Sequence, residues 1–198
     1  LFLAHKTKID LLKRAKTCLK PSKVVTLTKV DQLETQMRSG NLVFHGVPES
    51  SYAEAASVAS KDGGGQRPSS RQDTVKAVIE CCQKKLDLEI SERDITAGFR
   101  VPGPKNAPRP IVVTFASRLV RDRIYELRRL LRKQDTAQKV YINEHLTKKN
   151  ADIFSKGRKL LKEKRIASIW TWNGAVFVRR AESDRPTRVL SLEEVENF

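Results

Sequence analysis

Two short stretches of the chain decide its fold. Residues 41–49 are NLVFHGVPE and residues 109–115 are RPIVVTF. Each is an apolar run beside Gly or Pro, which is typical of a β-strand flanked by turns. Side chains alternate between the two faces of a strand, so Leu42 and Phe44 share one face. We therefore predict two strands and expect Leu42 and Phe44 to point into the core.

The segments between and after these strands alternate between helical and strand patterns. Residues 73–90 have apolar side chains at helical spacing, with Asp73 as the expected N-cap. Residues 95–100 alternate as a half-buried strand does, with Ile95, Ala97 and Phe99 on one side. An amphipathic helix is predicted for residues 117–134 and a strand for residues 139–146.

The order of these elements indicates the fold class. From residue 40 to residue 146 it is β-α-β-β-α-β, the ferredoxin-like arrangement of an antiparallel sheet with two helices on one face. The overall class is therefore α+β. We expect an RRM-like domain over residues 38–146, with a flexible loop at residues 50–71 that is rich in Gly, Ser and Ala.

Smaller units flank this domain. Residues 1–37 have apolar side chains at helical spacing, interrupted near Pro21, so they are either the remnant of a coiled coil or an amphipathic helix lying on its own domain. Residues 147–198 form a small α+β domain. Its signals are a helix capped by Thr147, a hairpin turn at Asn173-Gly174, and a final helical turn capped by Ser191.

Positive charge is concentrated in one part of the chain. The 198 residues have a net charge of +16, and residues 103–165 hold 18 Lys or Arg against 6 Asp or Glu. Such a concentration is the electrostatic footprint of a polyanionic partner. An anionic membrane surface competes with nucleic acid as that partner, but it usually requires a helix with Trp or Phe on its buried face.

Other classes of protein are excluded by what the sequence lacks. No run of apolar residues is long enough to cross a membrane, and the first residues do not form a signal peptide. The spacing of Cys18, Cys81 and Cys82 suits neither a disulfide framework nor a zinc site, so we expect a reducing compartment, cytoplasmic or nuclear. Cys81 or Cys82 is expected to pack inside a helix.

The chain also lacks the motifs of an enzyme. The segment GFRVPGPK does not end as a phosphate-binding loop does, and the three His residues have no helical pair spacing. No acidic cluster suggests a metal site. We therefore expect no catalytic centre, cofactor, metal ion or small-molecule substrate.

The sheet itself lacks the usual platform for nucleic-acid bases. RNA recognition motifs stack bases on aromatic rings of their middle strands. Here Pro110 and Val112 occupy the positions of those rings, and the first strand offers Val43 and His45. Binding through phosphate contacts is therefore expected, rather than sequence-specific reading of bases.

Arginines on the second helix are the first candidates for such contacts. Arg118 lies near a stripe formed by Arg121, Arg128 and Arg132, and few acids accompany them. The planar fork of Arg suits phosphate. A solvated charged face remains the alternative.

Two tryptophans in the C-terminal domain are ambiguous. Trp170 and Trp172 flank Thr171 on one strand, so both rings face one side. Core packing is the favoured interpretation for Trp170, and the alternative is a ring presented to an unstacked base. Basic side chains, among them Lys148, Lys149 and Arg158, belong to the neighbouring helix.

Several motifs together resemble a known family. RSGNLVFHGVPES, DITAGFRVPGPKNAPRPIVVTFASRLVRD, VYINEHLT, IWTWNGAVFVRR and VLSLEEVENF are similar, in this order, to the first open-reading-frame protein of LINE-type retrotransposons. Relatives with the same block occur as transposon-derived genes of animals and, more distantly, in baculovirus few-polyhedra proteins. The resemblance implies a nucleic-acid chaperone that assembles as a homotrimer through an upstream coiled coil and coats RNA in ribonucleoprotein particles.

The resemblance also implies binding residues. These are Arg38, Asn41, Arg100, Arg109, Lys148, Lys149 and Trp172. With the basic helices they complete the candidate nucleic-acid-binding set: Arg38, Asn41, Arg100, Arg109, Arg118, Arg121, Arg128, Lys148, Lys149, Arg158 and Trp172.

The expected function is sequence-tolerant binding of single-stranded RNA or DNA. The alternative is a protein–protein scaffold, including a domesticated transposon-derived interaction protein, assembled through the N-terminal helix.

Overall fold

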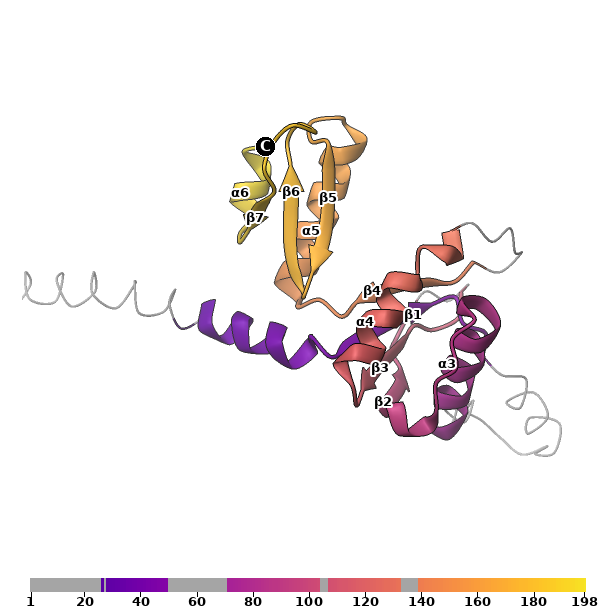
Figure 1. The fold of residues 1–198 in the computed structure, drawn as a ribbon. Helices are drawn as coiled ribbons and strands as arrows, with labels where there is room; N and C mark the ends of the chain where they lie inside the picture. Colours follow the sequence, from indigo (N-terminus) through magenta and orange to yellow (C-terminus); the bar gives the residue numbers. More distant parts are fainter. Residues whose placement is uncertain (1–25, 27, 50–70, 104–106, 133–138) are drawn as a thin grey trace, which may run out of the picture. The chain divides into compact units, whose positions relative to one another are not determined.

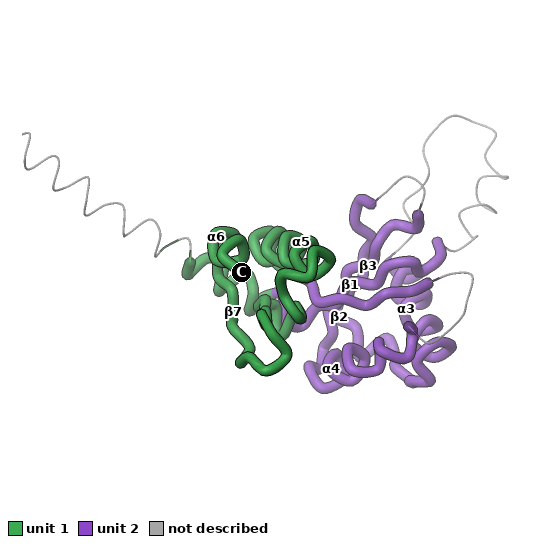
Figure 2. Tube along the Cα trace, turned by 90° about the horizontal axis from the view of Figure 1, so that it is seen from above, with its two compact units in different colours: residues 1–37, 146–198 green, residues 38–145 purple. Residues whose placement is uncertain are grey.

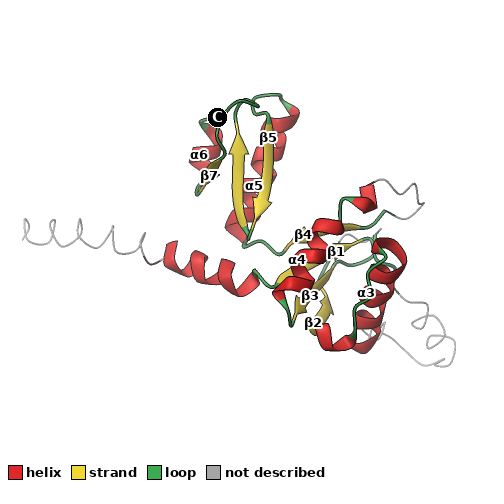
Figure 3. Cartoon of the chain, viewed as in Figure 1, coloured by secondary structure: helices red, strands yellow, loops and turns green. Residues whose placement is uncertain are grey.

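The described residues form two compact units. The computed structural model describes residues 26, 28–49, 71–103, 107–132 and 139–198 (Figure 1). One unit comprises residues 38–145, and the other comprises residues 146–198 with the described residues before residue 38 (Figure 2). Both mix helices and strands (Figure 3), so the predicted α+β class is confirmed.

The unit of residues 38–145 is built on an antiparallel sheet. Its elements are β1 (Asn41–His45), α3 (Arg71–Leu86), η1 (Glu92–Asp94), β2 (Ile95–Arg100), β3 (Ile111–Phe115), α4 (Arg118–Leu127), η2 (Leu130–Arg132) and β4 (Tyr141–Glu144). Within the described residues, four strands pair in the order β2-β3-β1-β4, and every pair is antiparallel.

The core of this unit lies between the sheet and both helices. Leu42 and Phe44 are fully buried, as predicted. They belong to one apolar cluster with Val78 and Cys82 of α3 and Ile124 of α4. Since these side chains meet the same strand face, α3 and α4 cover that face of the sheet.

Cys81 and Cys82 are both free and buried in α3, which confirms the prediction that a cysteine packs inside a helix. Burial raises the pKa of the Cys81 thiol to about 11 and that of Cys82 to about 12, so both stay protonated at neutral pH.

The prediction of which β2 side chains share one face of the sheet was wrong. A bulge between Ile95 and Ala97 shifts the register of β2 against β3. Beyond the bulge the side chains change faces, because an extra residue reverses the alternation. Ile95 is therefore buried as expected, whereas Phe99 is 51% exposed on the opposite face.

Two helix ends also differ from prediction. α3 begins at Arg71, so Asp73 lies in its first turn and is not its N-cap. α4 ends at Leu127 and is followed by the short turn η2, whereas one helix had been predicted through residue 134.

The C-terminal part is organised around a second sheet. It contains α5 (Lys148–Lys162), β5 (Ser168–Trp172), β6 (Ala175–Arg179), β7 (Thr187–Val189) and α6 (Leu192–Glu196). Among the described residues, three strands pair antiparallel in the order β5-β6-β7. Strand β7 was not predicted, because three residues next to a Pro give too short a pattern.

The predicted turn and caps of this part are confirmed. The Thr147 hydroxyl accepts a hydrogen bond from the Asn150 amide at the start of α5. The Ser191 hydroxyl does the same for α6. Asn173 and Gly174 both have positive φ, +50° and +76°, as a tight two-residue hairpin turn requires.

A glycine lets α5 approach the sheet closely. A Cβ atom on Gly157 would lie 2.2 Å from Ile169 Cδ1 of β5. Val176 and Val178 of β6 share that strand face and are buried with Ile153 of α5. The helix therefore covers the Ile169 face of the sheet, and Trp170 and Trp172 lie on the opposite face.

The chain before β1 is helical over residues 28–38, as predicted. Asp31 accepts a hydrogen bond from the Thr147 hydroxyl at 2.9 Å, and Lys149 Nζ lies 3.8 Å from its carboxylate. The carboxylate thus lies at the N-terminus of α5, where the helix dipole favours negative charge.

Other predictions fall outside the described residues. These are the helix before residue 26 and the flexible loop, except for Arg71. Among the described helices, none is long and apolar enough to cross a membrane.

Candidate nucleic-acid interface

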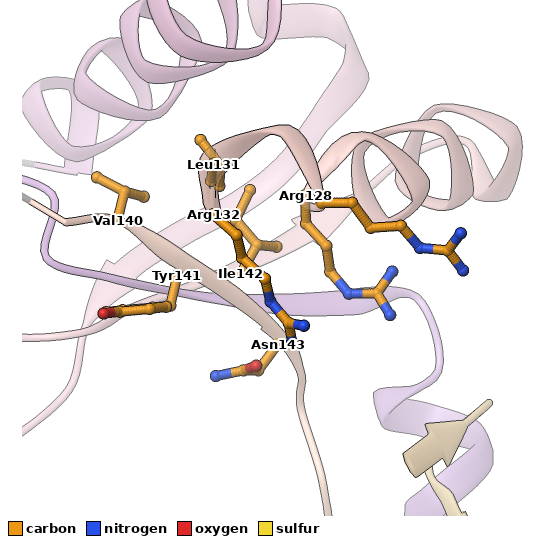
Figure 4. Close-up of a pocket in the computed structure, with 8 residues that line it drawn as sticks. Arg128, Leu131, Arg132, Val140, Tyr141, Ile142 and Asn143 are labelled. Carbon is orange, nitrogen blue, oxygen red and sulfur yellow. The ribbon is translucent and has the colours of Figure 1, made fainter. Parts of the chain in front are cut away.

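An arginine-lined cavity lies at the end of α4 in the unit of residues 38–145 (Figure 4). Its volume is about 270 Å³, just below the usual range for small-ligand sites. Its lining residues are Arg128, Arg129, Leu131, Arg132, Val140, Tyr141, Ile142 and Asn143. Among these described residues three are Arg and none is acidic. The cavity is therefore suited to an anion.

The three arginines lie just beyond the end of α4. At helical spacing, Arg128, Arg129 and Arg132 would lie within about 100° of one another around a helix axis. The chain leaves α4 after Leu127 and turns through η2, and all three arginines line one cavity beside β4. In Figure 4 the Arg132 side chain extends toward Asn143.

Strand β4 supplies the opposite wall. Its side chains alternate, so Ile142 and Glu144 are buried while Tyr141 and Asn143 face outward. Tyr141 is 51% exposed. An exposed phenol ring and an amide beside three guanidinium groups offer stacking and hydrogen bonding to a nucleotide as well as charge.

Arg128 is held in place by Tyr125. Its guanidinium carbon lies 3.4 Å from the centroid of the Tyr125 ring, and its NH1 donates to the Tyr125 carbonyl. Burial lowers the pKa of Arg128, but an Arg remains charged throughout the physiological range. A cation fixed in this way loses less conformational freedom when it binds phosphate.

Arg38 and Asn41 are brought together around a histidine. His145 Nε2 lies 3.5 Å from Arg38 NH1, and His145 Nδ1 lies 3.2 Å from Asn41 Nδ2. Burial, and then the charge of Arg38, lower the pKa of His145, so its ring is neutral at pH 7. The two predicted residues therefore form one polar cluster at the start of β1.

Arg100 has a structural role in this arrangement. Its guanidinium donates to the carbonyls of Val47 at 3.2 Å, Pro48 at 2.5 Å and Arg109 at 2.7 Å. These bonds join the segment after β1 to the segment before β3. The predicted phosphate contact would have to compete with three carbonyls.

Arg109 is paired with an acid. Its Nε and NH2 both donate to the Glu49 carboxylate, with NH2 at 2.8 Å from Oε2. The hydrogen bond from Arg109 lowers the pKa of Glu49 to about 2. Both side chains are more than a third exposed, 39% and 37%. A phosphate can reach this Arg only in competition with Glu49.

Arg121 does not face solvent, and its predicted place on an exposed basic stripe is wrong. Its side chain is 3% exposed, and NH2 lies 2.7 Å from Glu144 of β4. NH1 lies 2.8 Å from Asp122. Burial alone would lower the pKa of Arg121, but the hydrogen bonds with both carboxylates outweigh burial and raise it. The residue joins α4 to β4 and cannot reach a nucleic acid.

Arg118 remains accessible on α4. Its side chain is 54% exposed, and its Nε lies 3.9 Å from Asp122. Such exposed pairs are weak, so phosphate can displace the carboxylate.

The predicted residues of the C-terminal part lie at its surface. Lys148, Lys149 and Arg158 are exposed on α5, and Lys149 shares Asp31 with Thr147. Trp172 is 63% exposed at the end of β5.

Several candidate residues were missed by sequence reasoning. Arg129, Tyr141 and Asn143 line the cavity, and Phe99 is exposed on the open sheet face. The alternation of β4 was available as a signal for Tyr141 and Asn143. The bulge that exposes Phe99 has no signal in the local pattern.

One family model matches the C-terminal part of the chain. Residues 147–198 match the family model described as Baculovirus FP protein domain 2. No curated protein matches the chain. The match covers the C-terminal part and does not reach the unit of residues 38–145. Among the described residues, no group of three or more His, Cys, Asp or Glu side chains could hold a metal ion.

This match overturns the resemblance on which part of the sequence interpretation rested. IWTWNGAVFVRR and VLSLEEVENF lie within the matched residues, and the matched family is a baculovirus one. The assignment to LINE-type retrotransposon proteins is therefore wrong. The resemblance no longer supports the choice of binding residues, which must be argued from the structure.

Proposed function

We propose that this chain binds single-stranded nucleic acid with little sequence preference. The observation that carries the proposal is the cavity beside β4, where Arg128, Arg129 and Arg132 meet Tyr141 and Asn143. Guanidinium groups suit phosphate, and the phenol ring suits an unstacked base. Two further activities, nucleic-acid chaperoning and the coating of RNA in ribonucleoprotein particles, would require such binding.

We also propose that the unit of residues 38–145 is a ferredoxin-like, RRM-like domain. Support comes from the strand order β2-β3-β1-β4 and from two helices on one sheet face. On the open face, Val43 and Val112 face each other on the middle strands, where RRM proteins place stacking rings. Base reading by the middle of this sheet is accordingly not part of the proposal.

The proposed activity is binding without catalysis, a cofactor or a small-molecule substrate. A reducing compartment, cytoplasmic or nuclear, is proposed because Cys81 and Cys82 are free thiols.

A second candidate function is assembly with further copies of the chain. Val30, Leu33 and Met37 are 47%, 60% and 81% exposed on the helix before β1. Their spacing of three and four residues is that of a coiled-coil seam. A homotrimer or other oligomer formed through this seam would support the scaffold alternative and is compatible with nucleic-acid binding.

Two measurements separate these functions. A fluorescent 20-nucleotide oligo(U) is titrated with the protein, and anisotropy is compared with that of a duplex of equal length. The proposal expects saturable binding that favours the single strand. Light scattering of the chain with and without residues 1–38 reports assembly. An oligomer that leaves the anisotropy of oligo(U) unchanged would favour the scaffold.

A further inference from the structure

One face of the small C-terminal sheet carries aromatic rings and arginines together. The register of β5, β6 and β7 places on it, by alternation, Ser168, Trp170, Trp172, Ala175, Phe177, Arg179 and Arg188. α5 packs on the opposite face, through Gly157 against Ile169. The aromatic face is thus not the side that forms the core with α5.

The rings on this face are ordered and partly accessible. Trp170 and Phe177 are cross-strand partners whose ring centroids lie 6.0 Å apart, with the rings 16° from parallel. Both are half-buried. Trp172 lies two residues further along β5 and is 63% exposed. Side chains at this spacing on one strand are roughly 7 Å apart, so the rings form a row.

Positive charge accompanies the row. The guanidinium carbon of Arg179 lies 5.7 Å from the centroid of the Trp170 ring. Arg188, which is exposed, is the cross-strand partner of Phe177. Among the strand residues described on this face, none is acidic. Aromatic surfaces flanked by arginine complement the bases and phosphates of a single strand.

We propose that this face is a stacking platform for unpaired bases, separate from the arginine-lined cavity. Trp172 and the Trp170–Phe177 pair receive bases, while Arg179 and Arg188 neutralise the adjoining phosphates. The inference rests on the proposed binding of single strands. It adds a ring-based contact that tolerates any sequence, because every base has a π-face.

The chain itself supplies the probe for this platform. Its two tryptophans, Trp170 and Trp172, both lie on the face. Intrinsic tryptophan emission therefore reports base stacking there, while the anisotropy of a labelled oligonucleotide reports binding anywhere on the protein. Inorganic polyphosphate serves as a polyanion without bases.

The expected result is quenching of tryptophan emission by oligo(U) at saturation and little quenching by polyphosphate. Trp172→Leu should weaken oligo(U) binding about tenfold, equivalent to about 1.4 kcal/mol, and leave polyphosphate affinity unchanged. The same variant leaves Trp170 as the single reporter, whose emission should still fall. Leu190→Ala, which alters a 49% exposed apolar residue at the end of β7, is the matched control and should bind as the unaltered chain.

Failure of the platform differs from failure of the proposed function. If anisotropy rises while tryptophan emission and the affinity of Trp172→Leu stay unchanged, the platform is wrong and single-strand binding stands. If Trp172→Leu weakens the binding of polyphosphate as much as that of oligo(U), the face binds through charge and the inference is overturned. If the variant changes the oligomeric state, the face is a protein–protein contact and the inference is likewise overturned. If anisotropy never rises, the proposed function itself fails.

Discussion

At the residue scale, whether an arginine is paired and buried or lines a cavity depends on the carboxylate nearest to it. Arg121 and Arg128 are both arginines of the basic stretch, yet one is buried against Glu144 and the other lines a cavity. Counting charges along the sequence cannot distinguish the buried arginine from the one that lines the cavity. The difference depends on which residue of β4 faces each of them. Glu144 belongs to β4, twenty-three residues from Arg121.

The Arg121–Glu144 pair predicts a large loss of stability on substitution. Arg121→Ala removes the guanidinium group that pairs with the buried Glu144 carboxylate, which costs about 3–5 kcal/mol in unfolding free energy. Urea unfolding measures this loss. Arg118→Ala, at a 54% exposed side chain, is the control and should change the free energy by less than about 0.5 kcal/mol. Equal effects of the two variants would contradict the buried pair.

The Glu49–Arg109 pair predicts a gain of binding. Glu49→Gln removes the negative charge that competes for Arg109, so oligo(U) affinity should rise about twofold to tenfold, as one added phosphate contact allows. The pKa of Glu49 is lowered to about 2, and a carboxyl lowered on folding stays ionised above its unfolded value. The gain should therefore be the same from pH 5 to pH 8, and any stabilisation by the pair should disappear only as the pH falls toward 2. Unchanged affinity would show that Arg109 lies outside the interface.

At the element scale, the ends of helices and the irregularities of strands decide which side chains are exposed. The local patterns predicted the strands β1 to β4 and the helices between them, because alternation and helical spacing are local properties. They did not predict the end of α4 at Leu127, and they did not predict the bulge after Ile95, which depends on pairing with β3. The bulge accompanies the exposure of Phe99, and residues just beyond the end of α4 line the cavity.

The turn after α4 predicts unequal effects for arginines of one segment. Arg129→Ala and Arg132→Ala remove cavity charges and should each weaken oligo(U) binding and reduce the salt slope by about 0.7. Arg123→Ala removes an exposed charge of α4 that does not line the cavity, and should have a smaller effect. Anisotropy titrations at several salt concentrations measure these slopes. Equal losses for all three variants would indicate diffuse charge without a site.

The start of α5 predicts a capping effect. Thr147→Ala removes the hydroxyl that accepts from the Asn150 amide and donates to Asp31. The expected cost is about 1–2 kcal/mol, and Thr147→Ser should restore most of it. Hydrogen exchange of the α5 amides is the measurement. Protection that is indifferent to the hydroxyl would contradict the assigned cap.

At the scale of the whole molecule, the excess of charge is the property that the sequence conveyed best. The net charge of +16 predicts a polyanionic partner independently of the fold. The aromatic face of β5, β6 and β7 was less accessible to prediction, because β7 carries too short a pattern and the Trp170–Phe177 pairing requires a register. Charge is additive along the chain, whereas a binding surface depends on pairing between segments.

The salt dependence of binding tests the central claim most directly. Anisotropy of labelled oligo(U) is measured across a series of salt concentrations, and the logarithm of the association constant is plotted against the logarithm of salt. Six phosphate contacts at ~0.7 charges each predict a slope of about −4. A slope near zero, or no binding at low salt, would contradict the claim that the basic side chains of this chain bind a single-stranded polyanion.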